Sequence, residues 1–481
     1  MKRIGCPWGL LLAAGLAGGC AIGPDYRRPD LDLPDDWRGG AATTNCFADA
    51  AYADLYRDPV LNGLIATALS NSPDVRSALA RIEQAAAALR IQQADLWPSL
   101  NGSATYEKAR KGNVPPLRGA EGEEYDVFGA LSYELDVWGR VRRLDEAVRA
   151  QYLASEAARR SVEIGLVAGV ASTYFNLRAL DRQLEIATAT LAAREDMLEL
   201  TKIKFDDGAG IVSELDVAQA QTQVSSTKSS MANLQRLIAA TENALNLLLG
   251  GYPGDVPRGL GIAEQWQPED VPAGLPSDLL LRRPDVQAAE QNLVAANANV
   301  GVARAAYFPA ISLTGALGLQ SDELDDLFDA GLSKAWSFSP NLAAPIFNGG
   351  KIRANVRVAE AQRKQALADY EKSIQTAFRE VADALAGVQY LRRQLAADEE
   401  TLQAETRRLD LSQLRYEGGV DSYSDVLDAQ RYQFNAELTA VQTRNDLLNA
   451  VVQLYKALGG GWQAPAAASE TAAPAAKSQS P

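Results

Sequence analysis

The chain has 481 residues, with 61 acidic and 47 basic side chains, a formal net charge of −14 and no histidine. The lack of histidine excludes Ser-His-Asp and Cys-His nucleophilic sites and histidine-ligated zinc. The acidic balance, without a basic cluster, argues against a nucleic-acid partner. The sequence also contains neither a P-loop nor a dinucleotide-binding glycine motif. We therefore expect a protein that is not an enzyme, with no metal and no cofactor apart from a covalent lipid.

The lipid is predicted from the amino terminus. A short basic head at residues 1–3 precedes an apolar run at residues 8–17, and residues 16–20 read Leu-Ala-Gly-Gly-Cys. This pattern is typical of a secretory signal that ends in a lipobox, because the apolar run is too short to span a membrane. We expect Cys20 to be the acylated first residue of the mature chain, and Ala21 after it favours transfer to the outer membrane. The alternative is an ordinary cleaved signal with an incidental cysteine.

The rest of the chain contains an internal repeat, and the second copy follows the first at an offset of 211 residues. Residues 73–75 (Pro-Asp-Val) recur at 284–286, and residues 139–142 (Gly-Arg-Val-Arg) recur as Gly-Lys-Ile-Arg at 350–353. Because this offset is constant up to Gln219 and Gln430, the fold is predicted to be a duplicated supersecondary unit. Two independent tandem domains are the alternative, and these would need a self-contained core in each copy.

Each copy reads as a helix, two strands and a long helical hairpin. The predicted organisation is a signal peptide at 1–19, a lipidated amino-terminal and equatorial segment at 20–60, the first repeat at 61–250, a linker at 251–276, the second repeat at 277–461 and a disordered tail at 462–481. The expected strands are about 99–107 and 124–137 in the first repeat, and about 310–320 and 335–347 in the second.

The strand segments alternate apolar and polar residues, as from Leu100 to Glu107. Transmembrane β-strands need this alternation, although a half-buried strand in a soluble sheet shows it too. The lipobox and the duplication favour the membrane. Four strands cannot close a barrel, which takes roughly eight, and open sheet edges are not tolerated in lipid. We therefore expect several copies of the chain to share one barrel.

The helical hairpins are unusually long. No proline occurs between Gly139 and Phe205, and a helix of that length would extend about 100 Å. Apolar residues recur there at steps of seven, which indicates coiled-coil packing. In the first copy these are Val170, Leu177, Leu184, Leu191, Leu198 and Phe205. The glycine-containing turns at 207–210 and 418–421 would form the hairpin tips.

Five motifs carry a resemblance to a known family. They are residues 20–26 (Cys-Ala-Ile-Gly-Pro-Asp-Tyr), 282–286 (Arg-Arg-Pro-Asp-Val), 345–350 (Pro-Ile-Phe-Asn-Gly-Gly), 419–423 (Gly-Val-Asp-Ser-Tyr) and 426–431 (Val-Leu-Asp-Ala-Gln-Arg). Together they resemble the lipoprotein outer-membrane factors of tripartite efflux systems, the OprM- and NodT-like branch of the TolC superfamily. The resemblance implies a mixed α and β membrane protein in the outer membrane of a Gram-negative bacterium. It further implies a homotrimer with a 12-stranded β-barrel continued by a 12-helix α-barrel in the periplasm.

In such a system the protein would be a passive exit duct. Its expected partners are a periplasmic adaptor, an inner-membrane RND-type pump and outer-membrane lipid. An exit duct for type I protein secretion is the alternative within this class. A structural coiled-coil envelope lipoprotein and a carboxylate-based hydrolase are alternatives from other classes, and neither would conduct ions across a lipid bilayer.

The predicted site lies at the second hairpin tip. Asp425 and Asp428 are three residues apart on one helix face, and in a trimer they would form stacked rings of carboxylates that favour cations. The resemblance places both at the family's aperture and makes Arg431 a partner of Asp428 in the closed state. The alternative is that these acids only solvate the positive end of a helix.

The resemblance implies further tip residues. Glu214 and Tyr416 fall where the family has interhelix gate links, and Gly208, Gly210, Gly419 and Val420 would face the adaptor. Two positions depart from the family. Asp421 stands where some relatives have a gating arginine, and Ser424 stands where others have a gate leucine.

Overall fold

The computed structural model describes residues 21–34, 36–38, 46–110, 112, 121–207, 212–268, 272–274, 276–329 and 331–460. The predicted signal at 1–19, the lipidation residue Cys20, the tip glycines Gly208 and Gly210 and the tail at 462–481 lie outside these residues.

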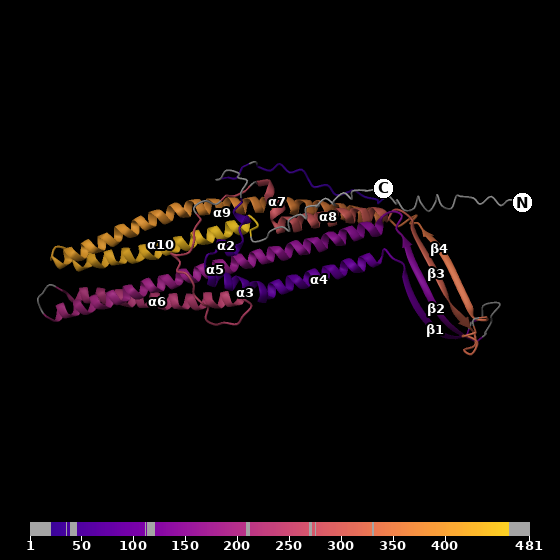
Figure 1. The fold of residues 1–481 in the computed structure, drawn as a ribbon, viewed down its shortest axis with the longest axis horizontal. Helices are drawn as coiled ribbons and strands as arrows, with labels where there is room; N and C mark the ends of the chain where they lie inside the picture. Colours follow the sequence, from indigo (N-terminus) through magenta and orange to yellow (C-terminus); the bar gives the residue numbers. More distant parts are fainter. Residues whose placement is uncertain are drawn as a thin grey trace, which may run out of the picture. The chain divides into compact units, whose positions relative to one another are not determined.

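The helices and strands follow the order predicted for a duplicated unit (Figure 1). In chain order they are η1 (Phe47–Asp49), α2 (Tyr52–Leu55), α3 (Pro59–Asn71), α4 (Pro73–Ala94), β1 (Ser99–Arg110), β2 (Glu121–Leu135), α5 (Arg140–Asp206), α6 (Glu214–Leu248), η2 (Pro276–Asp278), α7 (Leu279–Arg282), α8 (Pro284–Ala305), β3 (Ala310–Ser321), β4 (Lys334–Ala343), α9 (Lys351–Glu417) and α10 (Tyr423–Ala457). Among the described residues, no helix is both long enough and apolar enough to span a membrane.

The duplication is visible in the lengths of the elements. Helices α4 and α8 have 22 residues each, α5 and α9 have 67 each, and α6 and α10 have 35 each. Helix α10 begins two residues earlier than the constant sequence offset predicts. The reason is its cap, because Ser422 and Asp425 form a capping box there, whereas Ser213 and Asp216 cap α6.

The chain forms two compact units, and each unit contains residues of both copies. Unit 1 comprises Met1–Asp30, Ala80–Glu156 and Ala288–Lys372, and unit 2 comprises Leu31–Leu79, Ala157–Gln287 and Ser373–Pro481. The alternative of two independent tandem domains is therefore wrong, because neither copy has a core of its own.

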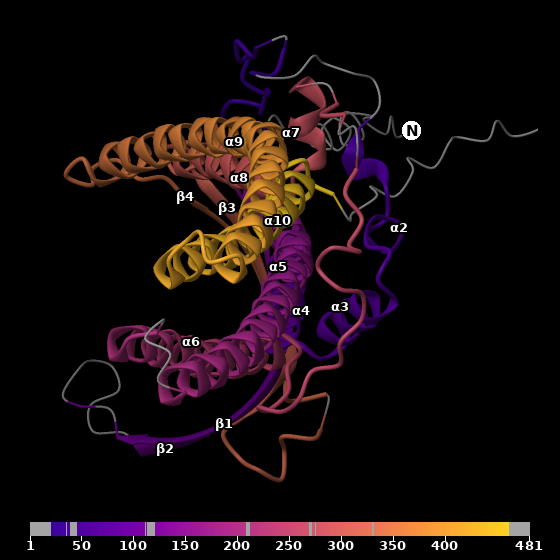
Figure 2. The ribbon, with the colours of Figure 1, turned by 90° about the vertical axis from the view of Figure 1, so that its left-hand side faces the viewer.

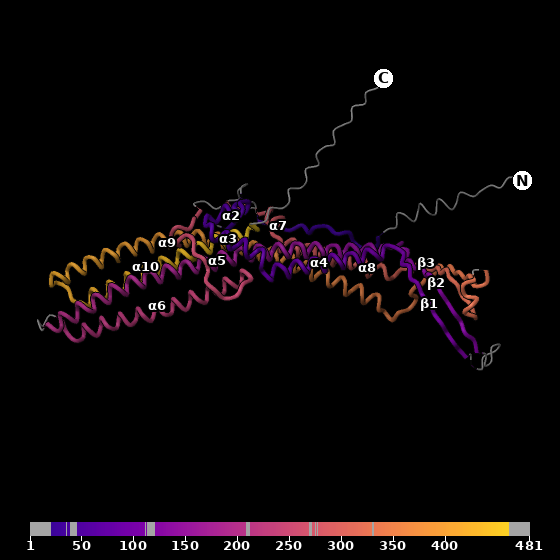
Figure 3. The backbone as a smooth tube through the Cα atoms, turned by 60° about the horizontal axis from the view of Figure 1, so that its bottom comes forward, coloured from indigo at the N-terminus to yellow at the C-terminus, as the bar shows by residue number. Residues whose placement is uncertain are grey.

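Unit 1 holds a four-stranded antiparallel sheet in the order β1-β2-β3-β4 (Figure 1), and β1 to β3 can also be followed in Figure 3. The central pair joins the two copies, since β2 pairs with β3. The register places apolar residues opposite one another, as Leu100 faces Leu131 and Leu317 faces Trp336. Because side chains alternate between faces, one face of the sheet collects the apolar residues and the other the polar ones.

The apolar face of this sheet is exposed in the single chain. Leu100 is 75% exposed, Trp336 is 73% exposed and Leu317 is 59% exposed. Aromatic pairs lie near both ends of the strands, with ring centroids 4.9 Å apart for Tyr106 and Tyr125 and 4.8 Å apart for Trp138 and Phe308. An apolar band between aromatic ends is the pattern that a lipid-facing sheet requires.

The predicted strand ends were partly wrong. The sequence predicted the last strand at 335–347, but β4 ends at Ala343. Pro345 follows, and proline has no backbone N–H for a ladder hydrogen bond. The other strands differ from prediction by at most three residues at either end.

Also in unit 1, the segment from Ala21 to Arg28 is bound along the helices. The Ile22 N–H donates to the Trp138 carbonyl at 3.0 Å. Glu290 of α8 accepts a hydrogen bond from the Tyr26 hydroxyl at 3.0 Å and two from the Arg28 guanidinium at 2.7 and 2.6 Å. These contacts hold the segment that follows Cys20 against Trp138 and α8.

In unit 2, α6 lies beside α5 and α10 lies beside α9 (Figure 2). The seven-residue pattern faces these neighbours, and most of its members are buried, as predicted. Buried members include Val170, Leu177, Leu198, Val224, Leu245, Val381, Val388, Leu395, Leu427, Phe434, Leu448 and Tyr455. Other members, such as Leu184 and Leu191, are half-buried, and Phe205 is exposed, with 42% of its side chain accessible.

A buried carboxylate connects three segments of unit 2. Asp58 is fully buried and caps α3, accepting from the Val60 and Leu61 N–H groups at 2.9 and 3.4 Å. It also accepts from the Tyr174 hydroxyl at 2.8 Å. The Leu260 N–H and the Gln265 side-chain amide donate at 3.0 Å each. Because all five donors are satisfied by one carboxylate, Asp58 holds the segment after α6 against α3 and α5.

Candidate functional site

The second hairpin tip begins with a glycine turn. The Gly419 N–H donates to the Tyr416 carbonyl at 3.0 Å, and the Val420 N–H donates to the Arg415 carbonyl at 2.9 Å. Gly419 has φ +71°, which ends α9 in the left-handed conformation that glycine adopts without strain. Val420, which follows it, is 66% exposed.

Asp425 and Asp428 lie on the first turns of α10, and both are exposed. The Asp425 carboxylate accepts from the Ser422 hydroxyl at 2.6 Å and from the Ser422 N–H at 3.2 Å. It is therefore part of the helix cap as well as a charge at the tip. Ser424 comes directly before Asp425 in sequence, and its hydroxyl oxygen lies 2.7 Å from the hydroxyl oxygen of Ser422.

Arg431 forms an ion pair with Asp428 within the chain. Its Nη2 atom lies 3.0 Å from Asp428 Oδ1, and about half of each side chain is exposed. An exposed pair of this kind contributes little to folding stability. Its effect is electrostatic, since the guanidinium offsets the charge of one of the two carboxylates on this face.

Asp421 has a partner that the sequence did not reveal. Its two carboxylate oxygens accept from Arg415 Nε and Nη2, each at 2.7 Å. The hydrogen bond from Arg415 lowers the pKa of Asp421, so the carboxylate stays ionised. The pair spans the glycine turn and connects the end of α9 to the residue before the α10 cap.

Tyr416 packs inside the tip. It contacts the cluster formed by Leu198, Ala220, Val224, Tyr423, Val426 and Leu427. Its ring centroid lies 5.6 Å from that of Tyr423 and 5.1 Å from Lys204 Nζ. Burial and then the negative charge of Asp216 raise the pKa of Tyr416. The predicted link residue Glu214 is the first residue of α6.

A buried arginine lies further along the hairpins. Arg194 is 6% exposed and donates from Nη1 to the Thr227 hydroxyl at 2.6 Å. Its guanidinium carbon lies 5.4 Å from the Phe434 ring centroid, so one side chain contacts α6 and α10. Burial lowers the pKa of Arg194. The repeat equivalent is Glu405, and this break in the duplication was the signal that could have identified the position.

Comparison with known proteins identifies the family. The model of the outer membrane efflux protein family matches residues 64–251 and 275–460, which are the two repeats. The solvent efflux pump outer membrane protein SrpC of Pseudomonas putida is 43% identical over 465 residues, covering 94% of this chain and 97% of SrpC. Outer membrane protein OprJ of Pseudomonas aeruginosa is 41% identical, covering 94% and 95%.

Solved structures agree with these sequence relatives. The open-state MtrE outer membrane channel of Neisseria gonorrhoeae has a TM-score of 0.84 and 34% identity, covering 92% of this chain and 98% of MtrE. The chain therefore belongs to the outer membrane efflux protein family.

Proposed function

We propose that this outer-membrane protein is the passive exit duct of a tripartite efflux pump. It would receive small molecules from an RND-type pump through a periplasmic adaptor and release them outside the cell. The relatives named as solvent and toluene efflux pump outer membrane proteins support this assignment. An exit duct for type I protein secretion is the second candidate, but the names of the relatives favour efflux.

The observation that carries the proposal is the exposed apolar face of the sheet together with its two edge strands. β1 and β4 each have a single neighbour in the order β1-β2-β3-β4. In lipid such edges must be paired, so strands of further copies have to complete the sheet. Three copies would give 12 strands and a closed barrel, and the helical hairpins of the three chains would give a 12-helix tunnel.

The tip residues are the proposed constriction. Threefold symmetry would bring three copies of Asp425 and three of Asp428 together, in rings that attract cations. Arg431 would reduce this charge while it is paired with Asp428. Tyr416, Tyr423 and Lys204 would hold the hairpins together at the same level, with Glu214 and Asp216 at the start of α6. Gly419 and Val420, and by repeat symmetry Gly208 and Gly210, would face the adaptor.

We also propose that Cys20 carries the lipid anchor. Its neighbour Ala21 begins the segment that is hydrogen-bonded along Trp138 and Glu290. Docking of this segment would keep the acylated end beside the residues that follow β2. Lipid on one residue per chain would then give a trimer three anchors, which is enough for stable membrane attachment.

Mass spectrometry of the purified full-length complex tests the assembly and the anchor. Under native conditions we expect a mass equal to three mature chains. The amino-terminal peptide should begin at Cys20 and carry a diacylglyceryl group. Any other number of chains would contradict the shared barrel, and an unmodified start elsewhere would contradict the anchor.

A further inference from the structure

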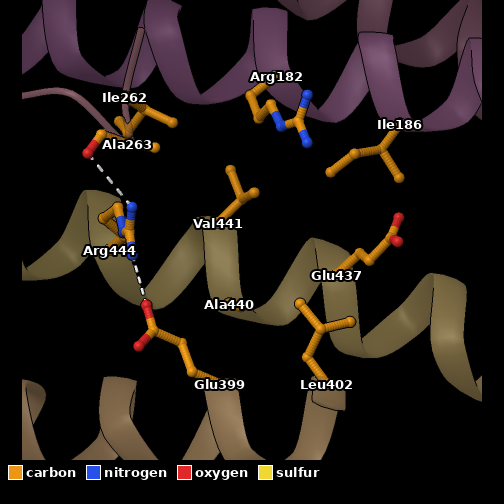
Figure 4. A pocket seen from close by; sticks show the side chains of 10 residues that line it. All are labelled: Arg182, Ile186, Ile262, Ala263, Glu399, Leu402, Glu437, Ala440, Val441 and Arg444. Atoms are coloured by element: carbon orange, nitrogen blue, oxygen red, sulfur yellow. Dashed lines mark hydrogen bonds and ion pairs between the residues drawn. The ribbon is translucent and has the colours of Figure 1, made fainter. Parts of the chain in front are cut away.

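Unit 2 contains a cavity that none of the predicted site residues line. Its volume is about 210 Å³, and it is bounded by α5, α9, α10 and the segment that contains Ile262 (Figure 4). It therefore lies between a helix of the first repeat and both long helices of the second.

The walls of the cavity are mainly apolar. Ile186 comes from α5, Leu402 from α9 and Val441 from α10, and Ile262 closes one side. An engineered apolar cavity of roughly 150 Å³ binds benzene, so this cavity can hold one aromatic ring with a short substituent. Hydrophobic contact would supply most of the binding energy for such a ligand.

The charges around the cavity are unequal. Arg444 is paired with Glu399 and also donates to the Ala263 carbonyl at 3.5 Å. Arg182 is paired with Glu185 at 3.0 Å. In the described part of the chain Glu437 forms no ion pair, and its carboxylate accepts a hydrogen bond from the neutral Gln433 amide at 3.0 Å.

Glu437 points into the cavity toward α5 (Figure 4). Burial raises the pKa of Glu437, and the positive charge of Arg182 only partly opposes this. Arg182 lines the same cavity but is paired with Glu185, so a cationic ligand would supply the ion pair that the half-buried Glu437 lacks among the described residues. Of the two carboxylates that line the cavity, Glu399 is paired with Arg444, so the apolar walls and Glu437 together select for one class of molecule.

We propose that the cavity binds a small amphiphilic cation. The apolar body, an aromatic ring or a compact branched group, packs between Ile186, Leu402 and Val441. The amidinium, guanidinium or ammonium head group donates hydrogen bonds to Glu437. This site is separate from the tip, and its occupancy does not depend on the proposed conduction.

Benzamidine is a suitable probe because its amidinium can donate two parallel hydrogen bonds to a carboxylate. Benzamide and benzoate have the same ring with a neutral and a negative substituent. In calorimetric titrations of the full-length protein in detergent, we expect benzamidine to bind about tenfold more tightly than benzamide, as for a hydrogen bond to a charged group. Benzoate should not bind.

Three variants assign the binding to this cavity. Glu437→Gln should weaken benzamidine binding about tenfold, to the level of benzamide. Asp446→Asn is the matched control, because Asp446 is an exposed α10 carboxylate that also accepts from the glutamine four residues before it, and this variant should bind like wild type. Val441→Phe should fill the cavity and abolish binding of both probes.

Several results would overturn the proposal. One is equal binding of the three probes, which would indicate partition into detergent. Another is wild-type affinity in Glu437→Gln, provided that circular dichroism shows the same helix content. No detectable binding of benzamidine to the wild-type protein would also reject it.

Discussion

Replacing Asp58 with alanine should lower the free energy of unfolding by about 5 kcal/mol. The substitution leaves five donors near a fully buried position without their shared acceptor. Each unsatisfied buried donor costs about 1–3 kcal/mol, so even the lower values add to this loss. Gly259 packs directly against this carboxylate, because a Cβ there would lie 2.2 Å from Asp58 Oδ1. Denaturant unfolding of the full-length protein, followed by circular dichroism, measures the change.

The control for this variant is Asp255→Ala, which removes an exposed carboxylate from the same connecting segment and should change stability by less than about 0.5 kcal/mol. Burial alone would raise the pKa of Asp58, but the hydrogen bonds from Gln265, Tyr174 and the α3 backbone lower it overall. A carboxyl with a lowered folded-state pKa stabilises the protein above its unfolded pKa of about 4. This stabilisation should be lost as the pH falls below 4, and the alanine variant should lack that part of the pH dependence. A variant as stable as wild type would show that the network does not hold the segment.

The double variant Asp425→Asn/Asp428→Asn should lose most of the cation selectivity of the duct. In a trimer it removes six negative charges from the proposed constriction, and we expect block by trivalent cations to weaken by about tenfold or more. Asparagine is preferable to alanine because the Asp425 carboxylate accepts from Ser422 in the capping box, and an amide oxygen can still accept. Single-channel recording measures both quantities.

Two single variants serve as controls for this experiment. Asp446→Asn changes an exposed carboxylate further along α10 and should leave selectivity and block unchanged. Arg431→Ala should raise the resting conductance, because it removes the cation that is paired with Asp428. Wild-type selectivity in the double variant would place both aspartates outside the conduction path. The acids would then only solvate the start of the helix.

Local periodicity predicted most of the elements. The constant repeat offset anticipated equal helix lengths in the two copies, and the steps of seven identified residues such as Leu177 and Val388 that are buried between helices. Alternation located all four strands, because one face of the sheet carries pairs of apolar residues such as Leu100 with Leu131 and Leu317 with Trp336. The sequence did not predict where β4 ends. The strand continues through Pro340, which pairs with Leu313, but it ends at Ala343, before Pro345.

The contacts that depend on distant segments could not be predicted. Asp58 meets Tyr174 and Leu260, and nothing in the local sequence around any of them indicates this network. At the tip, the positions of Asp425, Asp428 and Arg431 followed from helical spacing. The Arg415–Asp421 pair and the role of Asp425 in the cap depend on the conformation of the glycine turn, which spacing alone does not determine.

Single-channel recording of the full-length protein in a planar lipid bilayer tests most directly whether the chain forms a duct. The apolar face and open edges of the sheet predict that assembled copies insert into the bilayer and give discrete current steps. The aspartates at the tip predict that these currents are small at rest and selective for cations. A complex that inserts with its native helix content but passes no current, or that favours anions, would contradict the account.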